Sequence, residues 1–316
     1  MKRMIPLALL FLAACSTKQS EQTAAVSNAQ LTAVNQQFFS NNQLDKYWYQ
    51  GKAEVSRYEL RQNRYRDVHP GEVVMIFVTE DFLTDKQVKN DLYRNPNSIN
   101  ILKNNMVRRF TTGLYDYSIM TSTFTPVNAE KHPQTLKITT STQDWCGHTF
   151  MQVNWQKNQY KAQVHSYFEN EADQTFSTPF ALLEDELFTR IRLNGSKMPL
   201  GKIKILPSLS ITRLLHTNFE PLEAEASLQA YEGSDFEGAA LQSYKVTFTK
   251  SNRTIEIVFE NKQPFIIAGW KENYPSFDGK IRETVAKRAK TILTPYWQEN
   301  GLEDAGLRKE LGVSGL

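Results

Sequence analysis

Two stretches of sequence decide the fold class: His148-Thr149-Phe150-Met151-Gln152-Val153-Asn154-Trp155 and Tyr160-Lys161-Ala162-Gln163-Val164-His165-Ser166-Tyr167-Phe168. Polar and apolar side chains alternate in both, which is the two-residue period of a β-strand with one buried face. With Lys157-Asn158 as the turn, the predicted hairpin brings apolar residues opposite one another: Met151 with Val164, Val153 with Ala162, and Trp155 with Tyr160. One face of the ribbon is then apolar, which fixes its register.

A second hairpin is predicted from Tyr244–Phe248 and Ile255–Phe259, joined by a turn at Ser251-Asn252. In that register Val246 lies opposite Ile257 and Phe248 lies opposite Ile255. A third strand, Phe265–Trp270, follows the short polar segment Asn261–Pro264. Three successive short strands of this kind predict an antiparallel meander.

The rest of the chain is also rich in strand patterns. Strands are predicted at Ala53–Arg64, Val73–Thr79, Tyr117–Val127 and Leu136–Thr142, a loop at residues 81–98, and a short helix or an irregular strand at Ile101–Thr111. Helices are predicted at Phe180–Arg192, after a Thr178-Pro179 start signal, at Ile281–Leu293 and at Leu302–Leu311. We therefore expect a mainly β protein over residues 43–316: a single domain with a large antiparallel sheet, sandwich or open barrel and two or three flanking helices.

The N-terminus has the pattern of a bacterial lipoprotein signal. Lys2 and Arg3 precede an apolar run, Met4–Phe11, that is shorter than the roughly 20 residues needed to span a bilayer. Leu12-Ala13-Ala14-Cys15 then forms a lipobox. This predicts a cleaved signal peptide over residues 1–14, a lipid on Cys15, and a polar tether over residues 15–42. Because Ser16 replaces the aspartate that retains such proteins at the inner membrane, we expect an outer-membrane lipoprotein that faces the periplasm.

Composition excludes several functional classes. The 316 residues carry a formal net charge of +3, too small a field for a nucleic-acid partner. The chain contains no P-loop, no G-x-S-x-G, no H-E-x-x-H and no G-x-G-x-x-G motif, and we expect no cofactor. Of its two cysteines, Cys15 is assigned to the lipid, which leaves Cys146 without an intrachain partner.

One polar constellation could carry chemistry. Alternation places Cys146 and His148 on one face of the first hairpin, and the register brings His165 and Glu169 toward them. A thiolate beside a histidine is a nucleophile, and cysteine, histidine and glutamate are also zinc ligands. The alternative, which we favour, is that these polar side chains face solvent or complete a hydrogen-bond network. We likewise expect Arg108-Arg109 to be a solvated pair and His216 to lie at the edge of the core in a strand-like segment.

The opposite face of the same hairpin is apolar. It carries Met151, Val153, Trp155, Val164 and Phe168. A face of this kind is either ordinary core or the wall of a cavity for an apolar ligand. Both interpretations remain open at this level.

Four short runs resemble a bacterial lipoprotein family found mainly in Bacteroidota, over most of the mature chain: Tyr47-Trp48-Tyr49-Gln50-Gly51-Lys52-Ala53-Glu54, Val78-Thr79-Glu80-Asp81-Phe82, Tyr117-Ser118-Ile119-Met120-Thr121-Ser122 and Trp145-Cys146-Gly147-His148. Some members carry the automatic label "septum formation inhibitor Maf". Maf proteins are nucleotide pyrophosphatases with a Ser-Pro-Arg-Arg loop near the start, and this chain has no such loop. The resemblance therefore implies location and fold class and no nucleotide hydrolysis.

The sequence thus predicts a membrane-anchored, non-enzymatic module that binds an apolar ligand or an envelope partner, or that has a structural role. The alternative is a metal-binding or cysteine-dependent enzyme that uses Cys146, His148, His165 and Glu169.

Overall fold

The computed structural model describes residue 44 and residues 46–313 of the chain. The predicted signal peptide, the lipidation site Cys15 and the tether lie outside the described residues.

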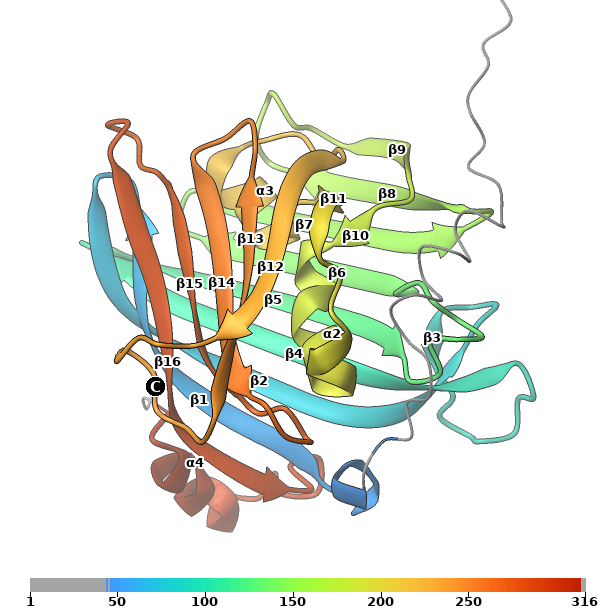
Figure 1. The fold of residues 1–316 in the computed structure, drawn as a ribbon. Coiled ribbons are helices and arrows are strands. Elements are labelled where there is room, and N and C mark those ends of the chain that lie inside the picture. Colours follow the sequence, from blue (N-terminus) through green and yellow to red (C-terminus); the bar gives the residue numbers. More distant parts are fainter. Residues whose placement is uncertain (1–43, 45, 314–316) are drawn as a thin grey trace, which may run out of the picture.

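Sixteen strands form one open sheet over this part of the chain (Figure 1). The order is β10-β11-β12-β13-β14-β15-β16-β1-β2-β4-β5-β6-β7-β8-β9, with β3 paired to β2 off this path. All pairs are antiparallel except β10 with β11, and the two end strands, β9 and β10, do not close a barrel. A mainly β fold with a large antiparallel sheet is therefore confirmed. The bounds are β1 (Ala53–Arg64), β2 (Asp67–Leu83), β3 (Val88–Lys89), β4 (Ser98–Thr112), β5 (Tyr115–Pro126), β6 (Lys137–Asp144), β7 (Gly147–Gln156), β8 (Gln159–Ser166), β9 (Gln174–Pro179), β10 (Leu182–Leu183), β11 (Gly201–Leu206), β12 (Leu222–Ala230), β13 (Leu241–Phe248), β14 (Arg253–Glu260), β15 (Ile267–Pro275) and β16 (Ile281–Thr294).

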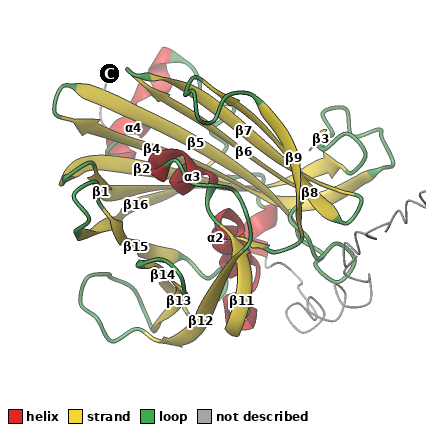
Figure 2. Cartoon of the chain, turned by 90° about the horizontal axis from the view of Figure 1, so that it is seen from above, coloured by secondary structure: helices red, strands yellow, loops and turns green. Residues whose placement is uncertain are grey.

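The sheet curls, and helices cover both of its faces (Figures 1 and 2). Helices α2 (Leu187–Asn194) and α3 (Leu209–Leu215) lie on the concave face, and α4 (Ala305–Leu311) lies on the convex face. Phe188 of α2 packs edge-on against Trp270 of β15, whereas Leu311 of α4 packs with Val55 and Val78. Short 3-10 turns occur at Lys46–Tyr49 (η1), Glu184–Glu186 (η2), Gly195–Lys197 (η3) and Leu302–Asp304 (η4). None of the described helices has the length and apolar character to cross a membrane.

Helix α2 enters the core with charged side chains, each of them paired. Arg192 donates two hydrogen bonds to the Glu54 carboxylate, and Arg190 lies 2.9 Å from Glu186. All four side chains are buried. Because a buried charge without a partner is strongly destabilising, these pairs determine where α2 can sit on the sheet.

The first predicted hairpin is confirmed. Strands β7 and β8 pair Met151 with Val164, Val153 with Ala162 and Trp155 with Tyr160. The second hairpin forms, but its predicted register is wrong by two residues: Val246 lies opposite Ile255 rather than Ile257, and Phe248 lies opposite Arg253. A shift of two residues leaves every side chain on the same face, so the apolar pattern cannot distinguish the two registers.

The predicted helix at Ile281–Leu293 is wrong, because this segment is strand β16, paired with β15 and β1. Its pairing with β1 skips Ala289, so the strand contains a bulge that breaks the alternation expected of a strand. Tertiary pairing on both sides overrides the local helical preference of its alanine, lysine and glutamate residues.

The predicted helix at Phe180–Arg192 begins later than expected. Thr178 and Pro179 belong to edge strand β9, Leu182–Leu183 form a short parallel strand, and the α-helix starts at Leu187. Glu186 supplies the acceptor for the Leu183 backbone N–H at 3.0 Å, so Thr178 does not cap this helix. The segment Ile101–Thr111 lies within long strand β4, and β2 extends to Leu83, into the predicted loop at residues 81–98. The terminal helix at Leu302–Leu311 is confirmed as η4 followed by α4.

Candidate functional site

The predicted polar constellation lies on the surface. Cys146 is exposed in the turn between β6 and β7, where the backbone N–H groups of Cys146 and Gly147 donate to the Asp144 carboxylate at 2.7 and 3.1 Å. His148, His165 and Glu169 are also exposed, and His165 lies 3.4 Å from Asp173. Glu169 lies beyond the last residue of β8, Ser166. Within the described residues, no group of three His, Cys, Asp or Glu side chains could hold a metal ion.

The predicted apolar face divides into core and cavity wall. Val153 is fully buried, and Trp155 packs edge-on against Tyr160 and Phe180. Met151, Val164 and Phe168 instead line a cavity of about 860 Å³. This volume lies within the range of sites that bind small molecules.

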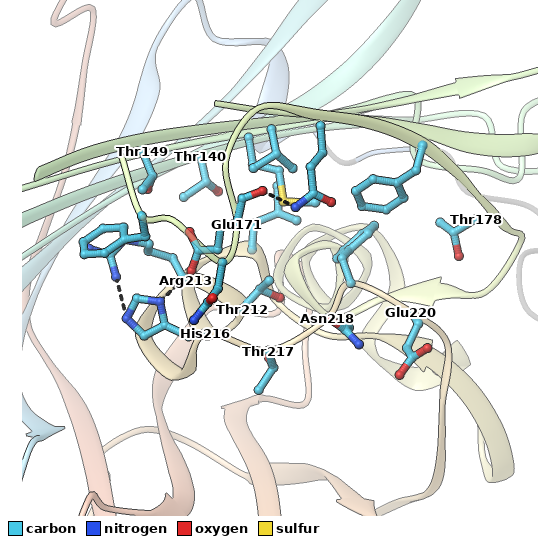
Figure 3. A pocket seen from close by; sticks show the side chains of 18 of the residues that line it. Thr140, Thr149, Glu171, Thr178, Thr212, Arg213, His216, Thr217, Asn218 and Glu220 are labelled. Carbon is cyan, nitrogen blue, oxygen red and sulfur yellow. Dashed lines mark hydrogen bonds and ion pairs between the residues drawn. The ribbon is translucent and has the colours of Figure 1, made fainter. Parts of the chain in front are cut away.

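The cavity lies between the end of the sheet and α3, and we call it the α3 cavity (Figure 3). One wall comes from β7, β8 and edge strand β9, and the other comes from α3 and residues 216–221. Its apolar lining includes Met151, Val164, Phe176, Leu209 and Phe219. Strand β9 pairs only with β8, so the sheet ends here and leaves the cavity open on one side.

Helix α3 is held at both ends. At its start, the Asp185 carboxylate accepts hydrogen bonds from the Leu209 N–H at 2.9 Å and from the Ser208 hydroxyl at 2.7 Å. Burial raises the pKa of Asp185 to about 7. At the other end, the Arg64 guanidinium donates to the Leu214 carbonyl, which places a positive charge at the negative end of the helix.

Arg213 lies at the centre of the polar end of the cavity. Its guanidinium lies 2.9 Å from the Asp144 carboxylate and 3.3 Å from His216 Nε2, and it covers the Phe168 ring at 4.2 Å. His216 is not in a strand, as predicted, but terminates α3 in the left-handed conformation with φ of 52°. Its Nδ1 lies 2.5 Å from Glu171, on the opposite wall.

Three buried polar atoms of cavity-lining residues have no hydrogen-bond partner among the described residues. They are Arg213 Nε, Thr212 Oγ1 and Thr178 Oγ1. Buried polar groups are nearly always satisfied in folded proteins, and a partner lost from one costs about 1–3 kcal/mol. All three atoms are enclosed by protein, and Thr178 lies at the far end of the cavity from Arg213 (Figure 3).

The polar end is not a site for a free anion. Asp144 already neutralises Arg213, and its carboxylate is buried. Three further carboxylates line the cavity: Glu169, Glu171 and Glu220. A carboxylate or phosphate of a ligand would meet like charges here, whereas an uncharged or cationic group would not.

The sequence did not predict that residues of α3, or Thr178, line a cavity. Helix α3 has only seven residues, too short for its apolar period to be recognised, although Ser208 before Leu209 is a start signal. Arg108, predicted to be solvated, is buried instead: it lies 2.8 Å from Glu272 and 3.0 Å from the Gln62 side-chain carbonyl.

No protein-family model, no curated protein and no solved structure matches the chain significantly.

Proposed function

We propose that the protein is a non-enzymatic envelope module that binds an amphipathic molecule in the α3 cavity. The observation that carries this proposal is the cavity of about 860 Å³, whose apolar lining meets a polar end formed by Arg213, His216 and Glu171. An apolar lining with a few polar groups that fix orientation is the usual composition of a small-molecule site.

The ligand has an apolar body and an uncharged or cationic polar end. The body packs on Met151, Val164 and Phe176, where its burial is favourable by about 25 cal/mol for each Å² removed from water. The polar end lies beside Arg213, His216 and Glu171. The carboxylates that line the cavity disfavour fatty-acid and phosphate headgroups and favour alcohols, amides and amines.

The location forms part of the proposal and has its support in the lipobox, Leu12-Ala13-Ala14-Cys15. A diacylated cysteine holds a protein firmly on a membrane. Mass spectrometry of the N-terminal peptide from the membrane fraction tests this assignment. We expect a peptide that begins at Cys15 and carries acyl chains, and an unprocessed or unlipidated N-terminus would refute it.

Displacement of a fluorescent probe tests the ligand class. The neutral dye N-phenyl-1-naphthylamine is bound to the purified protein and is then titrated with dodecylamine, dodecanol or dodecanoate. We expect dodecylamine and dodecanol to displace the dye at concentrations at least about tenfold lower than dodecanoate requires, the equivalent of one unfavourable charge contact of about 1.4 kcal/mol. Preferential displacement by dodecanoate would contradict the charge argument.

A matched pair of variants locates the binding. Val164→Trp places a large ring inside the cavity, on its apolar wall, and Gln163→Trp places the same ring on the adjacent residue of β8, whose side chain is exposed and does not line the cavity. We expect the first variant to lose dye binding and the second to retain it. Equal binding by both variants would place the dye elsewhere.

A further inference from the structure

The turns at one end of the strands carry a row of exposed aromatic and apolar side chains, which we call the aromatic edge. Four of them are largely exposed: Leu114 (81%), Trp145 (69%), Tyr167 (75%) and Phe277 (58%). They lie in the β4–β5 turn, the β6–β7 turn, the segment after β8 and the β15–β16 turn. In an antiparallel sheet alternate turns lie on the same edge, so these segments come together although they are far apart in sequence.

Ring contacts connect the row into one surface. Phe277 packs against Tyr65 with ring centroids 5.2 Å apart, Tyr65 against Tyr115 at 6.4 Å, and Tyr115 against Trp145 at 6.4 Å. Tyr167 covers the next turn, where a Cβ on Gly147 would lie 2.6 Å from its ring. The row extends from β16 to β8, which is about 30 Å at the usual spacing between strands.

We infer that the aromatic edge inserts into the interface of a lipid bilayer. Tryptophan and tyrosine are the residues enriched where a protein meets the boundary between headgroups and acyl chains, because each has an apolar ring and a polar tip. The exposed side chains form a single narrow row along the turns, not the broad patch that a protein partner of standard size covers. A fluid lipid surface accommodates such protrusions without a complementary shape.

The charge along the edge selects the lipid. The turns and the strand ends beside them carry more carboxylates than basic side chains: Asp67, Asp116, Asp144, Glu169, Glu171, Asp173 and Asp278 against Arg64, Arg66, Lys280 and Arg282. Attraction to anionic lipid therefore does not contribute, and the edge enters zwitterionic membranes through its apolar groups.

The chain length permits this contact with the anchoring membrane. The described chain begins beside β1, at η1, on the side away from the β1–β2 and β15–β16 turns (Figure 1). About 30 residues separate Cys15 from this point, enough for a maximum reach of roughly 100 Å, whereas β4, with 15 residues, is about 50 Å long. The inference rests on the geometry of the edge and is independent of the ligand in the α3 cavity.

A fluorophore attached to Cys146 tests the inference, since this exposed thiol lies beside Trp145. The Cys15→Ser protein has no site for acyl chains and keeps Cys146 as the one thiol of the sequence. It is purified, labelled with a nitrobenzoxadiazole dye and mixed with phosphatidylcholine vesicles that contain a doxyl-labelled lipid quencher, and every variant below carries the same substitution. The control carries the dye at the opposite edge, in the variant Tyr93→Cys/Cys146→Ser, because Tyr93 is equally exposed (69%). We expect lipid quenching at Cys146 and none at position 93.

Two further variants complete the test. Trp145→Ala/Tyr167→Ala is expected to lower vesicle partitioning of the Cys146-labelled protein by at least about tenfold, whereas Leu92→Ala/Tyr93→Ala leaves it unchanged. Absence of lipid quenching at Cys146 overturns the inference. Self-association that depends on Trp145, without lipid quenching, also overturns it and assigns the edge to a second copy of the chain. A failure of dye displacement from the α3 cavity leaves these readouts unaffected.

Discussion

The buried pair of Arg192 and Glu54 gives the sharpest test of how α2 is held on the sheet. In the variant Arg192→Met, the Glu54 carboxylate stays buried and retains hydrogen bonds only from Tyr47 and, at 3.4 Å, from Ser56. The variant also loses the contacts of the guanidinium with the Trp48 and Phe77 rings, at 4.7 and 4.9 Å from their centroids. Removal of one partner from a buried pair costs about 3–5 kcal/mol.

Urea denaturation, followed by tryptophan fluorescence, measures this cost. With an m-value of about 3 kcal/mol/M for a chain of this size, the midpoint of Arg192→Met falls by roughly 1–1.7 M. Two controls accompany it. Lys204→Met removes an exposed ion pair with Glu223 and changes stability by less than about 0.5 kcal/mol. The double variant Glu54→Gln/Arg192→Met removes the orphaned charge and recovers much of the loss.

The pH dependence has a definite sign. Burial alone would raise the pKa of Glu54, but Arg192 holds it below its usual value. In the wild type this carboxylate therefore contributes stability above about pH 4, and the contribution is lost as the pH falls through its depressed pKa. In Arg192→Met burial dominates, and Glu54 takes up a proton at higher pH. The difference between the two proteins must shrink from pH 7 to pH 5. A loss below 1 kcal/mol, or one that is independent of pH, would refute the reasoning.

Three further predictions follow from the structure. Burial raises the pKa of Asp185 to about 7, so the native state binds more protons than the unfolded state between about pH 4 and 7, and stability falls as the pH rises through this window. In Asp185→Asn we expect a smaller change of the unfolding free energy with pH, measured by urea denaturation, and an unchanged pH dependence would contradict the raised pKa. Ala240 has a φ of 48°, in the left-handed region that favours glycine, so Ala240→Gly stabilises the protein by about 1 kcal/mol in the same assay. Ala239 is not in that conformation, so Ala239→Gly does not stabilise the protein. Cys146 is exposed, so it reacts with a thiol reagent at the rate of an unfolded control, and Cys146→Ser changes stability by less than about 0.5 kcal/mol. Alkylation much faster than in the unfolded control would instead indicate an activated thiolate at this cysteine.

Sequence predicts well where one face of a strand is apolar and a turn is short. The β7–β8 hairpin meets both conditions, and its pairs are as expected. The register of β13 and β14 is less determined, because a shift by two residues preserves both faces. Strand β16 cannot be recognised from its own residues, since its pairing partners, β1 and β15, decide its conformation and a bulge at Ala289 interrupts its period.

The candidate site illustrates the same limit. Met151, Val164 and Phe168 are visible in the sequence as members of an apolar face, but only tertiary structure shows that they line a cavity rather than core. Arg213 lies on α3 and Thr178 on β9, and each meets the cavity beside residues that are distant in sequence. Buried charges are equally invisible, as Arg108 shows, because their partners lie on distant strands.

The most direct test of the central claim is native mass spectrometry of the protein purified from its own membrane fraction without a denaturing step. For the wild type and for Gln163→Trp we predict a non-covalent adduct that is released on unfolding and is an uncharged or cationic amphiphile. For Val164→Trp we predict no adduct, because the ring occupies the α3 cavity. A wild-type protein without an adduct, or an adduct that persists in Val164→Trp, would contradict the account.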